Sequence, residues 1–232
     1  MVSGIYWSVG ERSVNEDSVA YEEVLTDRGN CTLMAVCDGI GSLYRGEIVS
    51  GYITQCLVRW FYSEGIHMRV YAPGRIKRSL CRSLYNCHMD LSDTARKLDI
   101  KWGSTCTCVC IWGGRYVCVH LGDSAAYIIS PKRGGKKITK DHINNRGELI
   151  RCLGSMGYFM PDIITGRIYR GEGILVASDG FAGGFQMSEL SESLSFGKDI
   201  SEDRIVRRLA AIGNEAGRRG GSDNRSAVFM RR

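Results

Sequence analysis

The spacing of hydrophobic residues predicts three amphipathic helices. Apolar residues recur in pairs at every fourth position between Ile48 and Phe61, as they do on one face of a helix. Between Ile76 and Leu98 the apolar positions step mostly by four and three, and Pro73 stands near the start, where its missing N–H costs nothing. A third helix near the C-terminus is predicted by Ile205, Leu209, Ile212 and Ala216.

Short apolar runs bounded by glycine and polar residues predict strands on both sides of the first two helices. The Gly113-Gly114 dipeptide separates two of these runs and indicates a hairpin. Because the strands cluster and the helices are inserted between the clusters, we expect an α+β fold, as one domain over residues 1–232. The predicted strands cover residues 5–9, 18–25, 33–37, 104–112, 116–121, 125–129, 163–169, 174–178 and 227–230.

The charge of the chain is mildly basic, with 31 lysines and arginines against 25 acidic residues and a net charge of +6. Much of the excess lies at 132–140 and in the C-terminal tail, which we interpret as solvated loops. Proteins that bind nucleic acids usually gather such charge on one helix or face. We therefore expect no nucleic-acid partner. The opposite hypothesis would require salt-sensitive DNA binding through Lys132, Arg133, Lys136 and Lys137.

The ten cysteines include no C-x-x-C pair. Cys106, Cys108 and Cys110 alternate with other residues, so on a strand they share one face as small buried hydrophobes, and partner ligands for zinc are missing. No apolar run approaches the roughly 18 residues of a membrane span, and charged residues interrupt the N-terminus before a signal-like core develops. We expect a cytoplasmic, reducing setting without membrane contact.

Acidic residues mark the ends of several predicted strands. Loops at strand ends present functional groups, and small neighbours let the backbone approach a ligand. Two carboxylates about 4 Å apart repel by roughly 4 kcal/mol at an effective dielectric of 20, so a converging cluster must bind cations or protons. Oxygen donors favour Mg²⁺ or Mn²⁺ over zinc or copper. The acidic segments are Asn15-Glu16-Asp17, Asp38-Gly39, Asp123-Ser124, Asp179-Gly180 and Asp223-Asn224.

The order of these segments resembles the PPM family of metal-dependent serine/threonine protein phosphatases, type 2C, in particular its short bacterial members. The resemblance runs from residue 10 to residue 228. The motifs that carry it are G-x-R-x-x-N-E-D (10–17), A-V-C-D-G-I-G-S (35–42) with G-E (46–47), G-S-T (103–105), L-G-D-S (121–124), I-T-K-D-H (138–142), L-V-A-S-D-G-F (175–181) and S-D-N (222–224).

The resemblance implies a fold and a site. The fold is a β-sandwich of two antiparallel sheets flanked by helix pairs, in α-β-β-α layers, with two Mn²⁺ or Mg²⁺ ions at one end. Glu16 and Asp17 match the acidic pair that serves one ion directly or through water, and which of them coordinates is left open. By position, Asp38 would bridge both ions, Gly39 would offer its carbonyl, Asp179 and Asp223 would hold the other ion, Asp123 would help to hold a third, weaker ion, and Arg12 would bind phosphate.

The implied activity is hydrolysis of phosphorylated serine and threonine in proteins by direct attack of a metal-bridging hydroxide, with Arg12 and Asp38 as catalytic residues. A partner kinase and a monomeric state are expected with it. The alternative is a regulatory or binding module that keeps the fold with little turnover. Such a module would lose metal ligands, whereas every ligand position is filled in this sequence.

The sequence departs from the family pattern in three places. Only residues 143–150 separate Asp141-His142 from Arg151, where bacterial relatives usually insert a longer flap, so we expect a more open site. Ala125 stands where the family generally has arginine, and Ile40 where eukaryotic members often have histidine. We interpret His142 as structural.

Two other sites fit the sequence poorly. Residues 33–46 also suggest a dinucleotide loop, but an acidic residue stands where a pyrophosphate would lie. Ser178 has no nucleophile-elbow sequence around it, which speaks against a catalytic triad.

Overall fold

Two five-stranded antiparallel sheets pack face to face in the structure, a computed structural model that describes residues 1–27, 29–41, 43–68, 73–154, 159–197 and 200–232. The first sheet has the order β1 (Val2–Ser8), β12 (Arg225–Arg231), β11 (Gly173–Ala177), β7 (Ala125–Ser130) and β8 (Gly134–Lys137). The second has the order β10 (Asp162–Arg167), β6 (Arg115–Leu121), β5 (Cys106–Trp112), β3 (Gly29–Asp38) and β2 (Asp17–Thr26). A short pair, β4 (Gly103–Ser104) and β9 (Leu153–Gly154), lies beside the second sheet.

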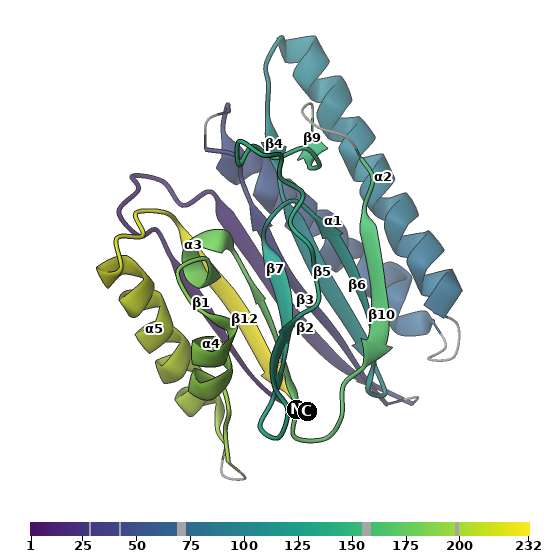
Figure 1. Ribbon diagram of the computed structural model, residues 1–232. Helices are drawn as coiled ribbons and strands as arrows, with labels where there is room; N and C mark the ends of the chain where they lie inside the picture. Colours follow the sequence, from purple (N-terminus) through teal and green to yellow (C-terminus); the bar gives the residue numbers. More distant parts are fainter. Residues whose placement is uncertain (28, 42, 69–72, 155–158, 198–199) are drawn as a thin grey trace.

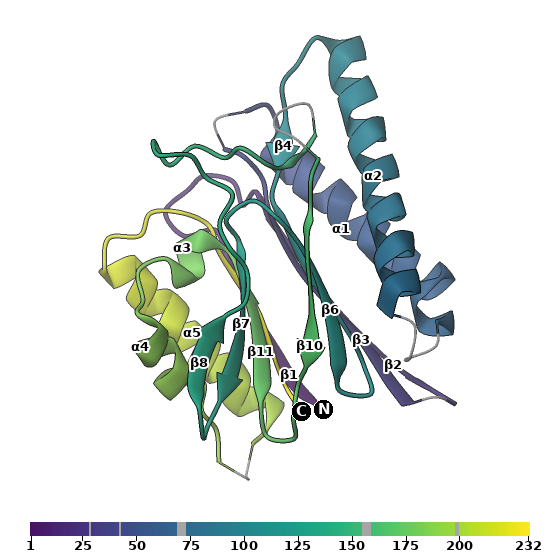
Figure 2. The ribbon, with the colours of Figure 1, turned by 45° about the vertical axis from the view of Figure 1, so that its right-hand side comes forward.

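Helices cover the outer face of each sheet, which gives four layers (Figures 1 and 2). The helices α1 (Gly46–Ser63) and α2 (Pro73–Leu98), joined through the 3₁₀ turn η1 (Gly65–His67), pack on the second sheet. The helices α3 (Asp179–Ala182), α4 (Met187–Ser193) and α5 (Glu202–Arg218) pack on the first. The predicted α+β fold with α-β-β-α layers is therefore confirmed.

Alternation along the strands explains how both faces of the second sheet are buried. On β3, Leu33 and Ala35 face the helices, while Met34 and Val36 face the other sheet. On β5, Cys106, Cys108 and Cys110 all face the helix layer, are fully buried and carry free thiols, as their spacing predicts.

Each predicted helix is present, with one difference of detail. In the pairs of apolar residues on α1, the second member faces the sheet, as Val49, Ile53 and Leu57 do. The first members differ: Ile48 in the first turn is 44% exposed, Tyr52 and Cys56 are partly buried, and Trp60 is buried in the core. The buried stripe of α1 is therefore narrower than the sequence pattern indicates only in the first turns of the helix.

The segment around Gly134-Gly135, predicted to be a loop, is in fact strand β8. It pairs with β7, with Tyr127 opposite Lys137 at one end and Ser130 opposite Gly134 at the other. The prediction is wrong because β8 is an edge strand without apolar alternation. Glycine lets this strand lie close to α4, since a Cβ on Gly135 would lie 2.2 Å from Met187 Cε. Helices α3 and α4 and strand β9 were not predicted, since they are too short to show a period. The strand predicted over residues 104–112 is divided at Thr105 into β4 and β5. Among the described residues, none of the helices has both the length and the apolar character needed to cross a bilayer.

Candidate functional site

A polar pocket of about 120 Å³ opens at one end of the sandwich. Both chain termini lie at the opposite end (Figure 1). Strands β3, β6 and β11 end beside the pocket, and β2 and β12 begin there, because the strands of both sheets are antiparallel. The pocket brings together all but one of the predicted site residues: Arg12, Glu16, Asp38, Gly39, Asp123, Asp179 and Asp223. It is completed by Ile40, Gly41, Thr105 and Leu149. The exception, Asp17, is buried next to it.

Asp17 and Asp38 stand directly opposite each other at the ends of β2 and β3. By the alternation that places Val19 and Val36 between the sheets, both carboxylates point into the space between the sheets. Asp17 is 2% exposed, and neither of its carboxylate oxygens has a hydrogen-bond partner in the described part of the chain. Burying a polar group without a hydrogen-bond partner costs free energy, and a bound proton or cation at these two oxygens would offset that cost.

Three carboxyl groups of the site, those of Asp17, Asp38 and Asp123, hold their protons unusually strongly. Burial raises the pKa of Asp38 well above its usual range, and the charges of Asp17, Asp179, Asp123 and Asp223 raise it further. Burial also raises the pKa of Asp17 to about 7, although the nearby hydroxyls of Ser226 and Ser178 act in the opposite direction. The pKa of Asp123 rises to about 6, mainly through burial and then through the charge of Asp179. Carboxylates from distant segments therefore repel one another across one small volume.

Backbone contacts fix Asp38 at the centre of the pocket. Thr105 Oγ1 accepts a hydrogen bond of 2.9 Å from Asp38 N, and Thr105 N donates one of 2.8 Å to Asp38 O. The Thr105 hydroxyl also lies 2.7 Å from Ser124 Oγ, next to Asp123. Thr105 is thus a functional residue that sequence reasoning missed; its G-S-T motif marked the position but gave it no role.

Close backbone approach places Glu16 beside Gly39. Gly39 N donates to Glu16 O at 3.0 Å, and Gly46 N donates to Glu16 Oε1 at 3.2 Å. A Cβ on Gly39 would lie 2.5 Å from the Gly46 carbonyl carbon, so only glycine fits here. Burial raises the pKa of Glu16, and the hydrogen bond from Gly46 partly offsets this. Glu16 lies in the pocket wall, whereas Asp17 lies beneath it.

The carboxylates at the mouth of the pocket each contact a local donor. Arg12 Nη2 lies 3.1 Å from Asp223 Oδ2, and both side chains are about half exposed. Asp223 Oδ1 accepts from Asn224 N at 2.8 Å, and Asp179 Oδ1 accepts from Gly180 N at 2.6 Å. Within the described residues, no three acidic, histidine or cysteine side chains are already close enough to chelate one ion.

Asn224 holds the loop that carries Arg12 and Glu16, and sequence reasoning gave it no role. Its side-chain oxygen accepts from Glu16 N at 2.8 Å, and its Nδ2 donates to Val9 O at 2.8 Å and to Val14 O at 3.0 Å. The side chain is 4% exposed and joins segments about 210 residues apart in the chain. Its place in the S-D-N motif was the only signal in the sequence.

Replacing Asn224 with alanine is therefore expected to destabilise the protein by about 2–3 kcal/mol, because three backbone groups lose a partner in a buried place. Urea denaturation measures the loss. The control is Asn30→Ala, which removes one exposed hydrogen bond to Glu23 and is expected to change stability by less than about 0.5 kcal/mol. Equal effects of the two substitutions would contradict the role given to Asn224.

His142 supports the loop that carries Asp123. Its Nδ1 accepts from Gly122 N at 3.1 Å, and its own N donates to Gly122 O at 2.8 Å. Its Nε2 lies 3.1 Å from Asp162 Oδ2 and 3.2 Å from Arg151 Nη1. These contacts fit the structural role expected for His142. In the short segment that follows it, Ile143 bridges to Leu149, which borders the pocket.

The geometry is unfavourable for the two other sites considered from the sequence. Ser178 is fully buried and exchanges hydrogen bonds with the Ser226 backbone, at 3.0 Å as acceptor and 3.4 Å as donor, so it is not an exposed nucleophile. Gly41 and Gly46 lie against the Glu16 carboxylate, where a dinucleotide site would hold a pyrophosphate. Every strand pair in the described part of the chain is antiparallel, so the βαβ unit of a dinucleotide site is missing there.

Solved structures share this fold across almost their whole length. The serine/threonine phosphatase Stp1 of Staphylococcus aureus superposes with a TM-score of 0.83 at 22% identity, over 99% of this chain and 94% of that chain. For PppA of Pseudomonas aeruginosa, described as a key regulatory component of T6SS, the TM-score is 0.77 at 26% identity. The match covers 99% of this chain and 96% of that chain. For the serine/threonine phosphatase PstP/Ppp of Mycobacterium tuberculosis the TM-score is 0.78 at 22% identity, and the match covers 98% of this chain and 96% of that chain.

Sequence comparison gives the family directly. No curated protein sequence matches the chain. The family described as protein phosphatase 2C, however, matches residues 9–212, which span the whole pocket except Asp223. With this match and the fold in agreement, the chain belongs to the protein phosphatase 2C family of serine/threonine protein phosphatases.

Proposed function

We propose that the chain dephosphorylates phosphoserine and phosphothreonine in proteins with divalent cations held around Asp38. Membership of the family gives the reaction class and the general dependence on metal. The observation that carries the proposal for this chain is the convergence of Asp17, Asp123, Asp179 and Asp223 on the buried Asp38 carboxylate.

The residues of the pocket fit divalent cations. The two oxygens of Asp17 lack hydrogen-bond partners, and the pKa values of Asp17, Asp38 and Asp123 are raised, as expected where positive charge is missing. The donors are carboxylate and carbonyl oxygens, which suit Mg²⁺ or Mn²⁺.

We assign the ligands of each ion as follows. Asp38 would contact two ions. Asp179 and Asp223 would complete one site, and Gly39 O with Glu16 or Asp17 the other. Asp123 would help to hold a third, weaker ion. All of these residues except Asp17 line the pocket.

The protein's own residues would bind and orient the phosphoryl group. Bound cations would lower the pKa of a water molecule from 15.7 to about 7, and the resulting hydroxide is a strong nucleophile. The Arg12 guanidinium, now paired with Asp223, would turn to two phosphoryl oxygens. Ile40 and Leu149 border the pocket, and its described lining contains no histidine. We therefore infer that the solvent protonates the leaving serine or threonine oxygen.

Further details of the setting are proposals as well. We propose that a partner kinase phosphorylates the substrates, that the chain acts as a monomer, and that it works in the cytoplasm. The free thiols of Cys106, Cys108 and Cys110 support a reducing compartment. The alternative of a binding module without turnover is not favoured, because every proposed ligand position carries an oxygen donor.

The proposal is tested with the purified chain, p-nitrophenyl phosphate and a phosphothreonine peptide. We expect hydrolysis of both with Mn²⁺ or Mg²⁺, loss of activity in EDTA, and recovery when excess Mn²⁺ is restored. Direct binding of Mn²⁺ is measured in parallel by calorimetry. A chain that binds Mn²⁺ and hydrolyses neither substrate would support the binding module instead.

A further inference from the structure

Three strands connect the acidic pocket with the opposite end of the first sheet. Strand β7 begins after Asp123 and ends at Ser130, β11 runs from Gly173 toward Asp179, and β12 runs from the Asp223 segment to Arg231. Six residues of extended strand span about 20 Å at 3.3 Å per residue. The far end of these strands is therefore separate from the phosphatase site, at the end where both chain termini lie (Figure 1).

A cavity of about 520 Å³ lies at this far end, larger than the acidic pocket. It is formed by the β7–β8 turn, by the connection from Tyr169 to Glu172 and by Phe196. Its size is in the range of cavities that hold drug-sized molecules and cofactors. Among the described lining residues, four are cationic and one is acidic: Lys132, Arg133, Arg170, Arg231 and Glu172.

The single acid of the cavity is already neutralised. Glu172 is 5% exposed; it pairs with Arg133 through Oε1 and accepts from Tyr169 N at 2.9 Å through Oε2. Arg133 also lies over the Tyr169 ring, 5.4 Å from its centroid. Glu172 therefore holds Arg133 and the turn in place and leaves the other cations of the cavity uncompensated.

The remaining cations have no acidic partner within the described part of the chain. Arg231 donates to the carbonyls of Gly171, at 3.2 Å, and of Gly197, and Lys132 and Arg170 are exposed at the rim. Guanidinium and ammonium groups that converge on a concave surface attract phosphate oxygens. The aromatic rings of Tyr169 and Phe196 add an apolar wall that a planar ring can contact.

We propose that this cavity binds a phosphate-bearing small molecule of nucleotide size. The phosphates contact Lys132 and Arg170, and the ring of the ligand packs against Tyr169 and Phe196. This proposal does not depend on phosphatase activity, because none of the described residues lines both this cavity and the acidic pocket.

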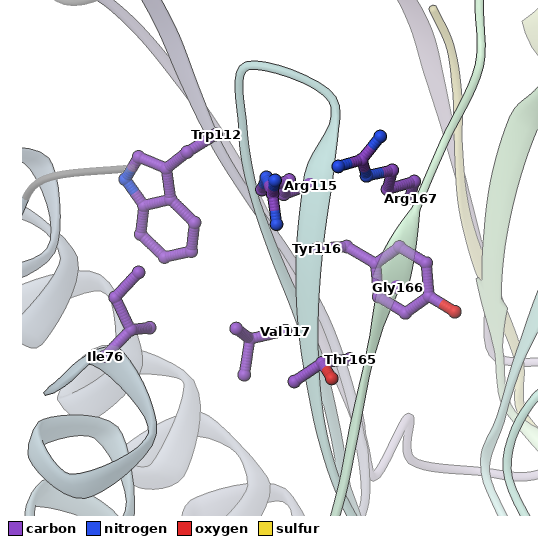
Figure 3. A pocket seen from close by; sticks show the side chains of 8 residues that line it. All are labelled: Ile76, Trp112, Arg115, Tyr116, Val117, Thr165, Gly166 and Arg167. Carbon is purple, nitrogen blue, oxygen red and sulfur yellow. The ribbon is translucent and has the colours of Figure 1, made fainter. Parts of the chain in front are cut away.

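A smaller basic cavity provides an internal comparison. It has a volume of about 210 Å³ and lies beside β6 and β10, where Arg115 and Arg167 are directly opposite each other (Figure 3). Like charges in such a cross-strand pair repel, so this place can also attract an anion. Its volume is less than half that of the larger cavity, which is why we assign the nucleotide-sized ligand to the latter.

The test is calorimetric titration of the full chain with ATP in EDTA, which removes cations that would bring phosphates to the acidic pocket. We expect ATP to bind, adenosine and inorganic tripolyphosphate each to bind at least about tenfold more weakly, and Lys132→Ala/Arg170→Ala to weaken ATP binding at least about tenfold. Melting temperatures check that each variant is folded. The matched control Lys97→Ala/Arg208→Ala removes one lysine and one arginine that are exposed on α2 and α5, and should bind ATP as the unchanged protein does.

Four results would overturn the proposal. They are no binding of ATP, equal loss in the matched control, loss only in Arg115→Ala/Arg167→Ala, and tripolyphosphate binding as tightly as ATP. The third would move the site to the smaller cavity, and the last would indicate a simple polyanion patch. A separate experiment adds vesicles of phosphatidylcholine with 30% phosphatidylserine. Sedimentation of the chain with them at moderate salt would be a fifth overturning result, because it would assign the cations to a lipid surface.

Discussion

Replacing Asp38 with asparagine is expected to lower phosphatase activity by about 10³-fold or more while leaving the protein folded. Asparagine keeps the backbone contacts with Thr105 but removes the charge on which the other carboxylates converge, so it cannot hold two cations. The rate of hydrolysis of a phosphothreonine peptide at saturating Mn²⁺ measures the loss.

The matched control for this variant is Asp93→Asn on the exposed face of α2, where Arg96 is the partner of the carboxylate among the described residues. It is expected to keep its activity and to change stability by less than about 0.5 kcal/mol. Activity of Asp38→Asn within tenfold of the unchanged protein at saturating Mn²⁺ would mean that Asp38 is not at the centre of the site.

The second large effect is on stability in the absence of metal. Burial raises the pKa of Asp17 from 3.8 to about 7, so between these pH values the folded chain binds a proton that the unfolded chain does not. Stability therefore falls as pH rises through this window. The shift of about three pKa units corresponds to roughly 4 kcal/mol at most. In EDTA, Asp17→Asn is expected to be no more stable than the unchanged protein at pH 4 and more stable by up to this amount at pH 7.

The difference between the two proteins is the quantity to measure, because buried His120 titrates in the same range with the opposite sign. Burial lowers the pKa of His120 to about 4, so the contribution of His120 to stability rises with pH. Both proteins contain His120, so this contribution cancels when the stability of one is subtracted from that of the other. Urea denaturation at pH 4, 5.5 and 7 gives both curves. Saturating Mn²⁺ should shrink the difference at pH 7, because a cation replaces the proton. A difference that does not change with pH would contradict the raised pKa of Asp17.

The acidic residues of the site could be predicted from the sequence because each stands at a strand end beside glycine, serine or asparagine. Their convergence could not, since it depends on the register that sets Asp17 opposite Asp38 and on the packing of two sheets. Thr105 and Asn224 were missed because neutral side chains that hold backbone groups of distant loops have no pattern in the sequence.

The sequence predicts the elements in which the hydrophobic pattern extends over many residues, and it does not predict the short ones. Helices α1, α2 and α5 carry long apolar stripes, whereas α3 spans four residues and β8 is a glycine-containing edge strand. The basic segment 132–140 was interpreted as solvated loops because charge in the sequence carries no information on which loops share one end of a sandwich. In the structure Lys132 and Arg133 face the same cavity as Arg170 and Arg231.

The most direct test of the account is the anomalous scattering of Mn²⁺ in a crystal of this chain soaked in manganese. We expect peaks inside the acidic pocket, with the strongest within coordination distance of Asp38 and a second ligand from Asp179 or Asp223. A well-ordered pocket without a peak, at a manganese concentration that supports hydrolysis, would contradict the central claim that these carboxylates hold the catalytic cations.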